Sequence, residues 1–183
     1  AYDRALAEHD AQIATIAGDP AAPGFDNVVL ALEKSGRLLT RVEGVFYNLT
    51  SAATNEALQA IEMEMAPRLS AHWSAVSMHP VLFARLDEVY RKRANLGLDE
   101  ESLRVLERYH LDFVRSGAQL KGDNRDRLAA IAQRLAVLGT QFGQNVLGDE
   151  EDWTLGLQDA QQAGIPASVR DAAAVQAKGL NRE

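Results

Sequence analysis

Apolar residues recur at steps of three and four between Asp123 and Leu147, which is the spacing of one face of an α-helix. The large members of this face are Leu128, Ile131, Leu135, Leu138, Phe142 and Val146. A neighbouring stripe holds only small residues, namely Ala129, Ala132, Ala136, Gly139 and Gly143. A non-polar face this wide is typical of a helix that packs against two neighbours, and glycine inside a helix suggests close backbone approach. We therefore predict a central helix over residues 123–147.

The same periodicity predicts further helices on both sides of this segment. They run from Tyr2 to Ala17, from Asp26 or Asn27 to Leu49, onward from a cap at Thr54, from Pro80 to about Asn95, from a cap at Asp99 to Gly117, and from Pro166 to Gly179. Pro67 falls inside the third of these helices and should kink it. Only in Trp153–Leu157 do apolar residues alternate with polar or small ones, as they do in a short extended segment. The prediction is an all-α single domain over residues 1–183, with about six or seven helices. Its long antiparallel helices surround the central helix 123–147.

Composition and charge exclude several functions. The 183 residues are 46% hydrophobic and 25% charged, which is ordinary for a globular domain with a hydrophobic core. The net charge of -7 and the scattered basic residues disfavour nucleic acid as a partner; the run Arg91–Arg93 is better explained as a solvated helix end. No cysteine is present, which removes disulfides and thiol chemistry and fits the cytoplasm. No apolar run approaches the roughly 20 residues that span a membrane, and no signal peptide is visible.

The residues that could carry chemistry do not form a recognisable active site. No histidine begins an H-E-x-x-H zinc motif. A zinc pair of His72 and His79 is disfavoured because a helix break separates them, so we expect His72 at the edge of the core and His79 as a cap. His110 is expected to be a buried, hydrogen-bonded histidine. Glu62 and Glu64 lie on different helix faces.

The acidic run at residues 149–152 lacks the spacing of a calcium loop and is better explained as a solvated loop. The sequence also contains no G-x-S-x-G, P-loop or dinucleotide motif. We predict no catalytic, cofactor-binding or metal-binding residue in this chain.

An ordered set of sequence segments resembles a known family. The segments are FDNVVLALEKSGRLLTRVEGVFYNLTSAATNEALQAIE, MAPRLSAH, HPVLFARLDEVY, LGLDEESLRVLERYHLDFVRSGAQL, RLAVLGTQFGQNVL, WTLGL and AGIPASVRDAAAVQAKG. In this order they resemble the N-terminal helical region of the thimet oligopeptidase family of zinc metallopeptidases, and most closely its bacterial peptidyl-dipeptidase branch. One departure is Val28-Val29, where the family more often has Thr or a similar residue; we interpret it as a packing variation.

The resemblance implies a role in a longer enzyme. Both ends of the chain look cut, so we expect a fragment that forms the non-catalytic wall of a substrate channel. The family's zinc site, an H-E-x-x-H helix and a later Glu, has no counterpart here, so zinc is expected only in the parent enzyme. The parent is expected to be a cytoplasmic peptidase that releases C-terminal dipeptides from short unstructured peptides, and the catalytic half of the same chain is the expected partner.

The alternative is a free-standing helical interaction module that offers a groove to a partner helix. The two hypotheses differ in the surface that they leave exposed. A channel wall should leave apolar residues bare where the catalytic half docks, along Trp153–Leu157 and the last helix. An interaction module should be closed apart from one groove.

Overall fold

The computed structural model describes residues 1–179, without the side chains of residues 151, 152, 159 and 160. Helices and connecting segments account for all of the described residues, with no strand among them. Seven α-helices have 13 residues or more, which confirms the prediction of an all-α fold with about seven helices. The chain divides into two compact units, Ala1–Gln144 and Asn145–Glu183. The single-domain assignment stays a prediction.

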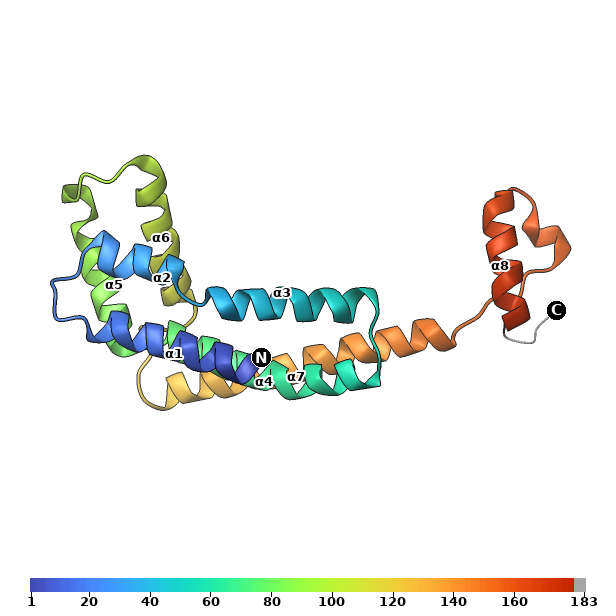
Figure 1. Ribbon diagram of the computed structural model, residues 1–183, viewed down its shortest axis with the longest axis horizontal. Coiled ribbons are helices and arrows are strands. Elements are labelled where there is room, and N and C mark those ends of the chain that lie inside the picture. The colour runs from blue at the N-terminus through green and yellow to red at the C-terminus, as the bar shows by residue number, and fades with distance from the viewer. Residues whose placement is uncertain (180–183) are drawn as a thin grey trace. The chain divides into compact units, whose positions relative to one another are not determined.

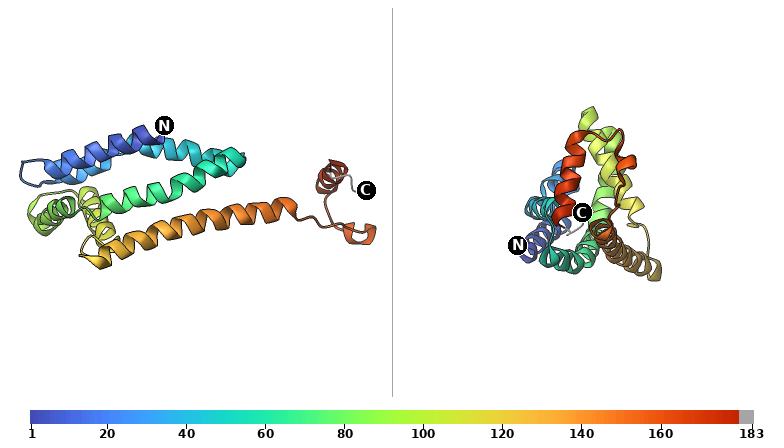
Figure 2. Two further views of the ribbon diagram at one scale, coloured as in Figure 1. Left: turned by 90° about the horizontal axis from the view of Figure 1, so that it is seen from below. Right: turned by 90° about the vertical axis from the view of Figure 1, so that its right-hand side faces the viewer.

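The first unit holds most of the helices. In chain order its elements are α1 (Tyr2–Gly18), η1 (Phe25–Leu30), α2 (Ala31–Lys34), α3 (Arg37–Ala52), α4 (Glu56–Ser77), α5 (Pro80–Lys92), η2 (Arg93–Asn95), α6 (Glu100–Arg115) and the larger part of α7 (Asp123–Asp152). Helices α3 and α4 run antiparallel, and α5 and α6 stand side by side at one end of them (Figure 1). The part of α7 that belongs to this unit runs antiparallel to α4 (Figure 2).

The hydrophobic core lies where α1, η1, α2, α4, α5 and α6 meet. Its buried members are Ile13, Ile16, Val28, Val29, Leu32, Val76, Leu82, Leu86, Val89, Leu106 and Phe113. A smaller cluster of Ala5, Leu39, Met65 and Leu69 joins α1, α3 and α4. Fully burying a Leu or Val side chain contributes about 1.5–3 kcal/mol. These clusters therefore hold the first unit together, and helix α1 takes part in both.

The long helix predicted from Asp26 or Asn27 to Leu49 is wrong, because the chain breaks it at Ser35-Gly36. Ser35 has an extended backbone and Gly36 adopts a left-handed one, with φ 67°. Gly36 also lies close to α1, since a Cβ there would sit 3.1 Å from the His9 ring. Its amide donates to Gln12 Oε1 at 2.8 Å. The break turns the chain from α2 into α3 and brings Ser35 beside α1.

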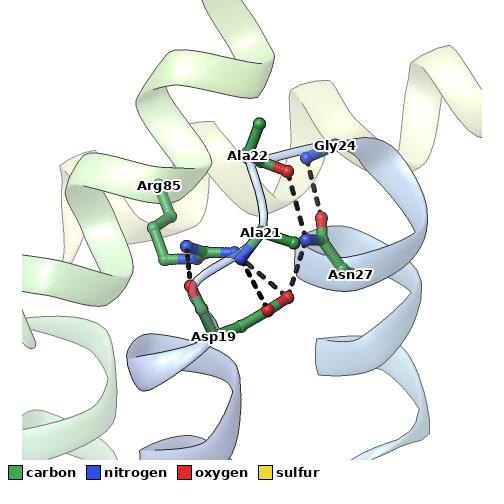
Figure 3. A network of polar contacts seen from close by, with 6 residues as sticks. All are labelled: Asp19, Ala21, Ala22, Gly24, Asn27 and Arg85. Carbon is green, nitrogen blue, oxygen red and sulfur yellow. Dashed lines mark hydrogen bonds and ion pairs between the residues drawn. The ribbon is translucent and has the colours of Figure 1, made fainter.

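The loop between α1 and η1 is held by a polar network (Figure 3). The Asp19 carboxylate accepts from the Ala21 amide at 2.9 Å and from Asn27 Nδ2 at 2.7 Å. Asn27 Oδ1 accepts from the Gly24 amide at 2.7 Å, and Arg85 from α5 donates to the Asp19 carbonyl at 2.7 Å. The Ala21 amide, and after it Asn27, holds the pKa of Asp19 below its usual range. The network joins the end of α1 and the start of η1 to the middle of α5.

The helix caps test the residue-level predictions. His79 Nδ1 accepts from the Leu82 amide at 3.2 Å and Asp99 Oδ1 accepts from the Ser102 amide at 2.7 Å, so both predicted caps are confirmed. The predicted cap at Thr54 is wrong by one residue, because Asn55 accepts from the Leu58 amide.

Two further helix predictions concern Asn27 and Pro67. The first turn of η1 begins after Gly24 and not at Asp26 or Asn27, although the Asn27 side chain binds the Gly24 amide there. Helix α4 continues through Pro67 without a break.

The central role predicted for helix 123–147 is also wrong. The helix is present as α7, but none of its described side chains is buried. The half-buried side of the helix carries Ala129, Ala132 and Ala136 of the small stripe, whereas Gly139 and Gly143 are exposed. Gln144, also half-buried, donates from Nε2 to the Gln59 carbonyl at 3.0 Å and to Glu62 at 3.1 Å. At Gly139 and Gly143 no atom lies within 4 Å of the place of a Cβ, so these glycines do not serve close backbone approach. Periodicity locates an apolar face but does not tell what covers it.

The second unit comprises the end of α7, η3 (Asp159–Gln162) and α8 (Ala167–Gly179). Trp153–Leu157 is not helical, which agrees with the predicted extended segment. No described residue of α8 is buried. Trp153 and Leu155 are 69% and 65% exposed, and Val175 is 73% exposed. These three apolar side chains are therefore largely exposed.

Candidate functional site

Two buried histidines from distant parts of the chain form a direct pair. His9 on α1 is 2% exposed and His72 on α4 is 8% exposed. His9 Nδ1 lies 2.8 Å from His72 Nε2. The pair continues at both ends, because His72 Nδ1 lies 3.1 Å from Asp10 Oδ1 and His9 Nε2 lies 3.3 Å from Ser35 Oγ. The result is one hydrogen-bonded chain that crosses α1, α4 and the turn between α2 and α3.

The sequence analysis did not identify His9 as a candidate site residue. Its partner is 63 residues away in the sequence, so no local spacing reveals the pair. The available signal was its position in the apolar stripe of α1 with Ala5, Ile13 and Ile16, all of which are buried. Burial, followed by the neighbouring His72, lowers the pKa of His9. The prediction that His72 lies at the edge of the core is confirmed, but the sequence analysis did not predict its contact with His9.

A cavity of about 460 Å³ opens beside this pair. It is lined by His9, Ile13, Leu32, Glu33, Ser35, Thr40, Trp73, Val76, Ser77, Tyr109, Asp112, Phe113 and Ser116. The Tyr109 hydroxyl donates to Glu33 Oε2 at 2.6 Å. Burial, then the bond to Glu33, raises the pKa of Tyr109 well above its usual range. The cavity lining therefore combines apolar side chains with carboxylates and hydroxyls, and among the described residues no Lys or Arg lines it.

The contacts in this cavity do not make a hydrolytic centre. A nucleophilic serine needs a free hydroxyl and nearby amides to hold an oxyanion. The Ser35 hydroxyl instead lies 2.7 Å from the Leu32 carbonyl and donates to it. The adjacent Gly36 amide is taken by Gln12. The histidine chain is thus a structural network, and no attack on a substrate is derived from it.

The other predicted candidates lie apart from one another. His79 caps α5, whereas His110 Nε2 pairs with Asp87 at 3.0 Å and its ring stacks on Tyr90 at 3.8 Å. His110 is therefore a hydrogen-bonded and largely buried histidine, as predicted.

The predicted carboxylate groups are also dispersed. Glu62 accepts from Gln144, and Glu64 from Arg68 at 3.1 Å. The acidic run 149–152 lies at the end of α7 and is helical rather than a loop, and its last two side chains lie outside the described residues.

The residues described do not fit a zinc site. Within residues 1–179, no group of three or more His, Asp or Glu side chains is placed to hold a metal ion. Structural or catalytic zinc requires at least three protein ligands. We therefore derive no zinc-dependent step from these residues.

The second candidate site is the outer face of α7. Ile131, Leu135, Leu138 and Phe142 follow one another at steps of four, three and four, and they are 46%, 63%, 41% and 71% exposed. Single exposed apolar residues are common on protein surfaces, but a contiguous stripe on one helix is typical of an interaction surface. We call these four residues the α7 stripe. The described part of the chain contains no helix both long and apolar enough to cross a membrane.

Comparison with known proteins shows which proteins the chain is similar to. No family model matches the chain. Over 98% of its length it is 39% identical to the dipeptidyl carboxypeptidase of Salmonella typhimurium, and over all of its length 38% identical to that of Escherichia coli. It is 27% identical over its whole length to oligopeptidase A of Salmonella typhimurium. The chain spans about 27% of the length of each of these relatives.

These relatives define a class of peptidases. At 38–39% identity along the chain, the sequence is a homologue of one part of the dipeptidyl carboxypeptidases, with oligopeptidase A further away. The predicted resemblance to this peptidase family is confirmed.

Proposed function

We propose that the chain is the N-terminal, non-catalytic part of a zinc metallopeptidase, where it forms a wall of the substrate channel. The parent cleaves short unstructured peptides in the cytoplasm and releases dipeptides from their free C-termini. Zinc belongs to the remaining part of the parent, and this chain alone is inactive. The observation that carries the proposal is similarity along the whole chain to dipeptidyl carboxypeptidases that are almost four times as long.

The α7 stripe supports a role as one part of a larger protein. Its four large side chains are exposed, whereas Ala129, Ala132 and Ala136 of the same helix are half-buried. Burial of a large apolar side chain contributes about 1.5–3 kcal/mol, so covering this stripe is strongly favourable. We propose that the catalytic half of the parent covers it. The bare residues Trp153 and Leu155 in the second unit have the same explanation.

A chimera tests the proposal. In it, this chain replaces the aligned segment of the Escherichia coli dipeptidyl carboxypeptidase, and release of dipeptides is measured on short peptides with a free or an amidated C-terminus. We expect the chimera to cleave the free form and the isolated chain to be inactive with or without added zinc. Hydrolysis by the isolated chain would overturn the proposal that catalysis belongs to the remaining part of the parent.

Paired variants in the chimera test the role of α7. The substitutions Leu135→Asp and Phe142→Asp place charges in the α7 stripe and should abolish assembly and activity. Arg134→Asp and Gln141→Asp change exposed positions outside the stripe on the same helix and should leave activity largely intact. Equal activity of the two pairs would contradict docking through the stripe.

A further inference from the structure

The hydrogen-bonded chain through His9 and His72 can be complete only in one state of protonation. At one end, the Asp10 carboxylate can only accept, so His72 Nδ1 must carry a hydrogen. At the other end, the Leu32 carbonyl can only accept, so the Ser35 hydroxyl hydrogen points to it across 2.7 Å. A hydroxyl has a single hydrogen, and therefore the 3.3 Å contact between Ser35 and His9 requires a hydrogen on His9 Nε2.

One more hydrogen must lie between the two rings. The distance of 2.8 Å between His9 Nδ1 and His72 Nε2 is that of a hydrogen bond, in which one nitrogen donates and the other accepts. The two rings together thus carry three hydrogens on nitrogen. Two neutral imidazoles carry two. We infer that His9 and His72 share one additional proton, as an imidazolium–imidazole pair that locks α1, α4 and the turn between α2 and α3 together.

The surroundings suit a single positive charge. Asp10 on α1 contacts the pair, and Glu43 on α3 interacts with His72. Glu33 on α2 and Asp112 on α6 line the cavity that His9 also lines. Trp73 on α4 packs edge-on against both rings, with centroids 5.3 Å and 5.4 Å away. A charge in a partly buried site is stabilised by opposite charges nearby, and here the carboxylates supply them.

A second added proton would break the hydrogen bond between the two rings. With four hydrogens on the rings, both nitrogens that face each other across 2.8 Å would be donors, and their bond would break. Burial and the neighbouring ring also lower the pKa of His9. Because His9 binds its proton less readily in the folded chain, the stability that it contributes is present above about pH 6.5 and is lost as the pH falls below that value.

Removal of the shared proton also weakens the lock. Without the shared proton, the rings carry two hydrogens on nitrogen for three contacts, so one contact must lose its hydrogen bond. The contact that then lacks a hydrogen is the long one between Ser35 and His9. All three hydrogen bonds are therefore complete only while the pair holds one additional proton.

Nuclear magnetic resonance of the ring nitrogens tests the inference on the full chain. Two-bond proton–nitrogen spectra report which ring nitrogens carry hydrogen. In the wild-type chain near neutral pH we expect three hydrogens on the pair. Ser35→Ala removes the group that forces a hydrogen onto His9 Nε2, so the variant should carry two, with one proton fewer bound. Ser77→Ala removes another hydroxyl of the same cavity, which donates to the Ser74 carbonyl, and should retain three.

Trp73 offers an independent readout of the second protonation. In a Trp153→Phe background it is the remaining tryptophan, and its fluorescence should change as acid breaks the bond between the rings. His110, which pairs with Asp87, is the internal control, and its ring signals should be the same in all variants.

Two results would overturn the shared proton. The first is two neutral rings in the wild-type chain near neutral pH with no response to Ser35→Ala. The second is a one-to-one zinc complex that shifts both ring signals, since that would make the pair a metal site.

Discussion

Replacing Asn27 by alanine removes the amide that joins the end of α1 to the start of η1 (Figure 3). Asn27 Oδ1 accepts from the Gly24 amide at 2.7 Å, and Nδ2 donates to the Asp19 carboxylate at 2.7 Å and to the Ala22 carbonyl at 3.2 Å. A neutral hydrogen bond contributes about 0.5–1.5 kcal/mol net and a bond to a charged group about 1.5–3 kcal/mol. The third bond is exposed and adds little. Because the first two bonds are only partly buried, Asn27→Ala should cost an amount near the lower end of their sum, about 2–3 kcal/mol.

Thermal or urea unfolding followed by circular dichroism measures this cost. For a chain of this size, about 2–4 °C in Tm corresponds to each kcal/mol, so we expect Tm to fall by about 5–10 °C. Asn55→Ala is the matched control, because Asn55 makes a single cap bond to the Leu58 amide and its loss should cost about 1 kcal/mol.

The pH dependence of Asn27→Ala adds a second check. Asn27 helps to keep the pKa of Asp19 low, after the Ala21 amide. The stability that ionised Asp19 contributes is present above the ordinary aspartate pKa of about 3.9 and is lost as the pH falls. The difference between wild type and Asn27→Ala should therefore shrink in acid. If Asn27→Ala cost no more than Asn55→Ala at neutral pH, the reasoning about this network would be refuted.

Two further predictions concern Gly36 and the α7 stripe. Gly36→Ala should destabilise the chain by about 1–3 kcal/mol, because φ is 67° and the new Cβ would lie 3.1 Å from the His9 ring. Gly44→Ala, at a position with open space within α3, should instead stabilise the chain by up to about 1 kcal/mol. Equal urea midpoints of the two variants would contradict both predictions. The double variant Leu135→Ser and Phe142→Ser should lower the free energy of unfolding by less than about 1 kcal/mol, because both side chains are largely exposed. Leu86 is fully buried, so Leu86→Ala should lower it by about 2–5 kcal/mol. A comparable loss in both variants would show that the stripe is buried.

The local signals in the sequence were sufficient for most helices and several ends. Asp99 and His79 cap the predicted helices because a short side chain before an apolar run can accept the first free amides. The predicted helix across Ser35-Gly36 failed because its apolar periodicity continues through the break. The left-handed turn at Gly36 depends on tertiary contacts with Gln12 and His9, which no local pattern contains.

The largest error, the central position of α7, has a similar origin. A helix that packs inside a domain and a helix that presents its apolar face to another part of a protein have the same periodicity. The exposure of Leu135 and Phe142 separates the two cases, and exposure is a property of the whole fold. The histidine pair was missed for the same reason, since His9 and His72 meet only after α1 and α4 pack together.

The central claim is that the α7 stripe docks onto the catalytic part of a peptidase. The chain contains no cysteine, so Phe142→Cys introduces a unique thiol at a position that is 71% exposed. Its rate of alkylation, followed by mass spectrometry of the peptide that contains it, can be compared between the isolated chain and the chimera. Arg134→Cys, exposed on the same helix outside the stripe, is the control. We expect rapid labelling at 142 in the isolated chain and at least roughly tenfold protection in the chimera, where burial excludes the reagent, with little change at 134. Equal labelling of position 142 in both proteins would contradict the claim.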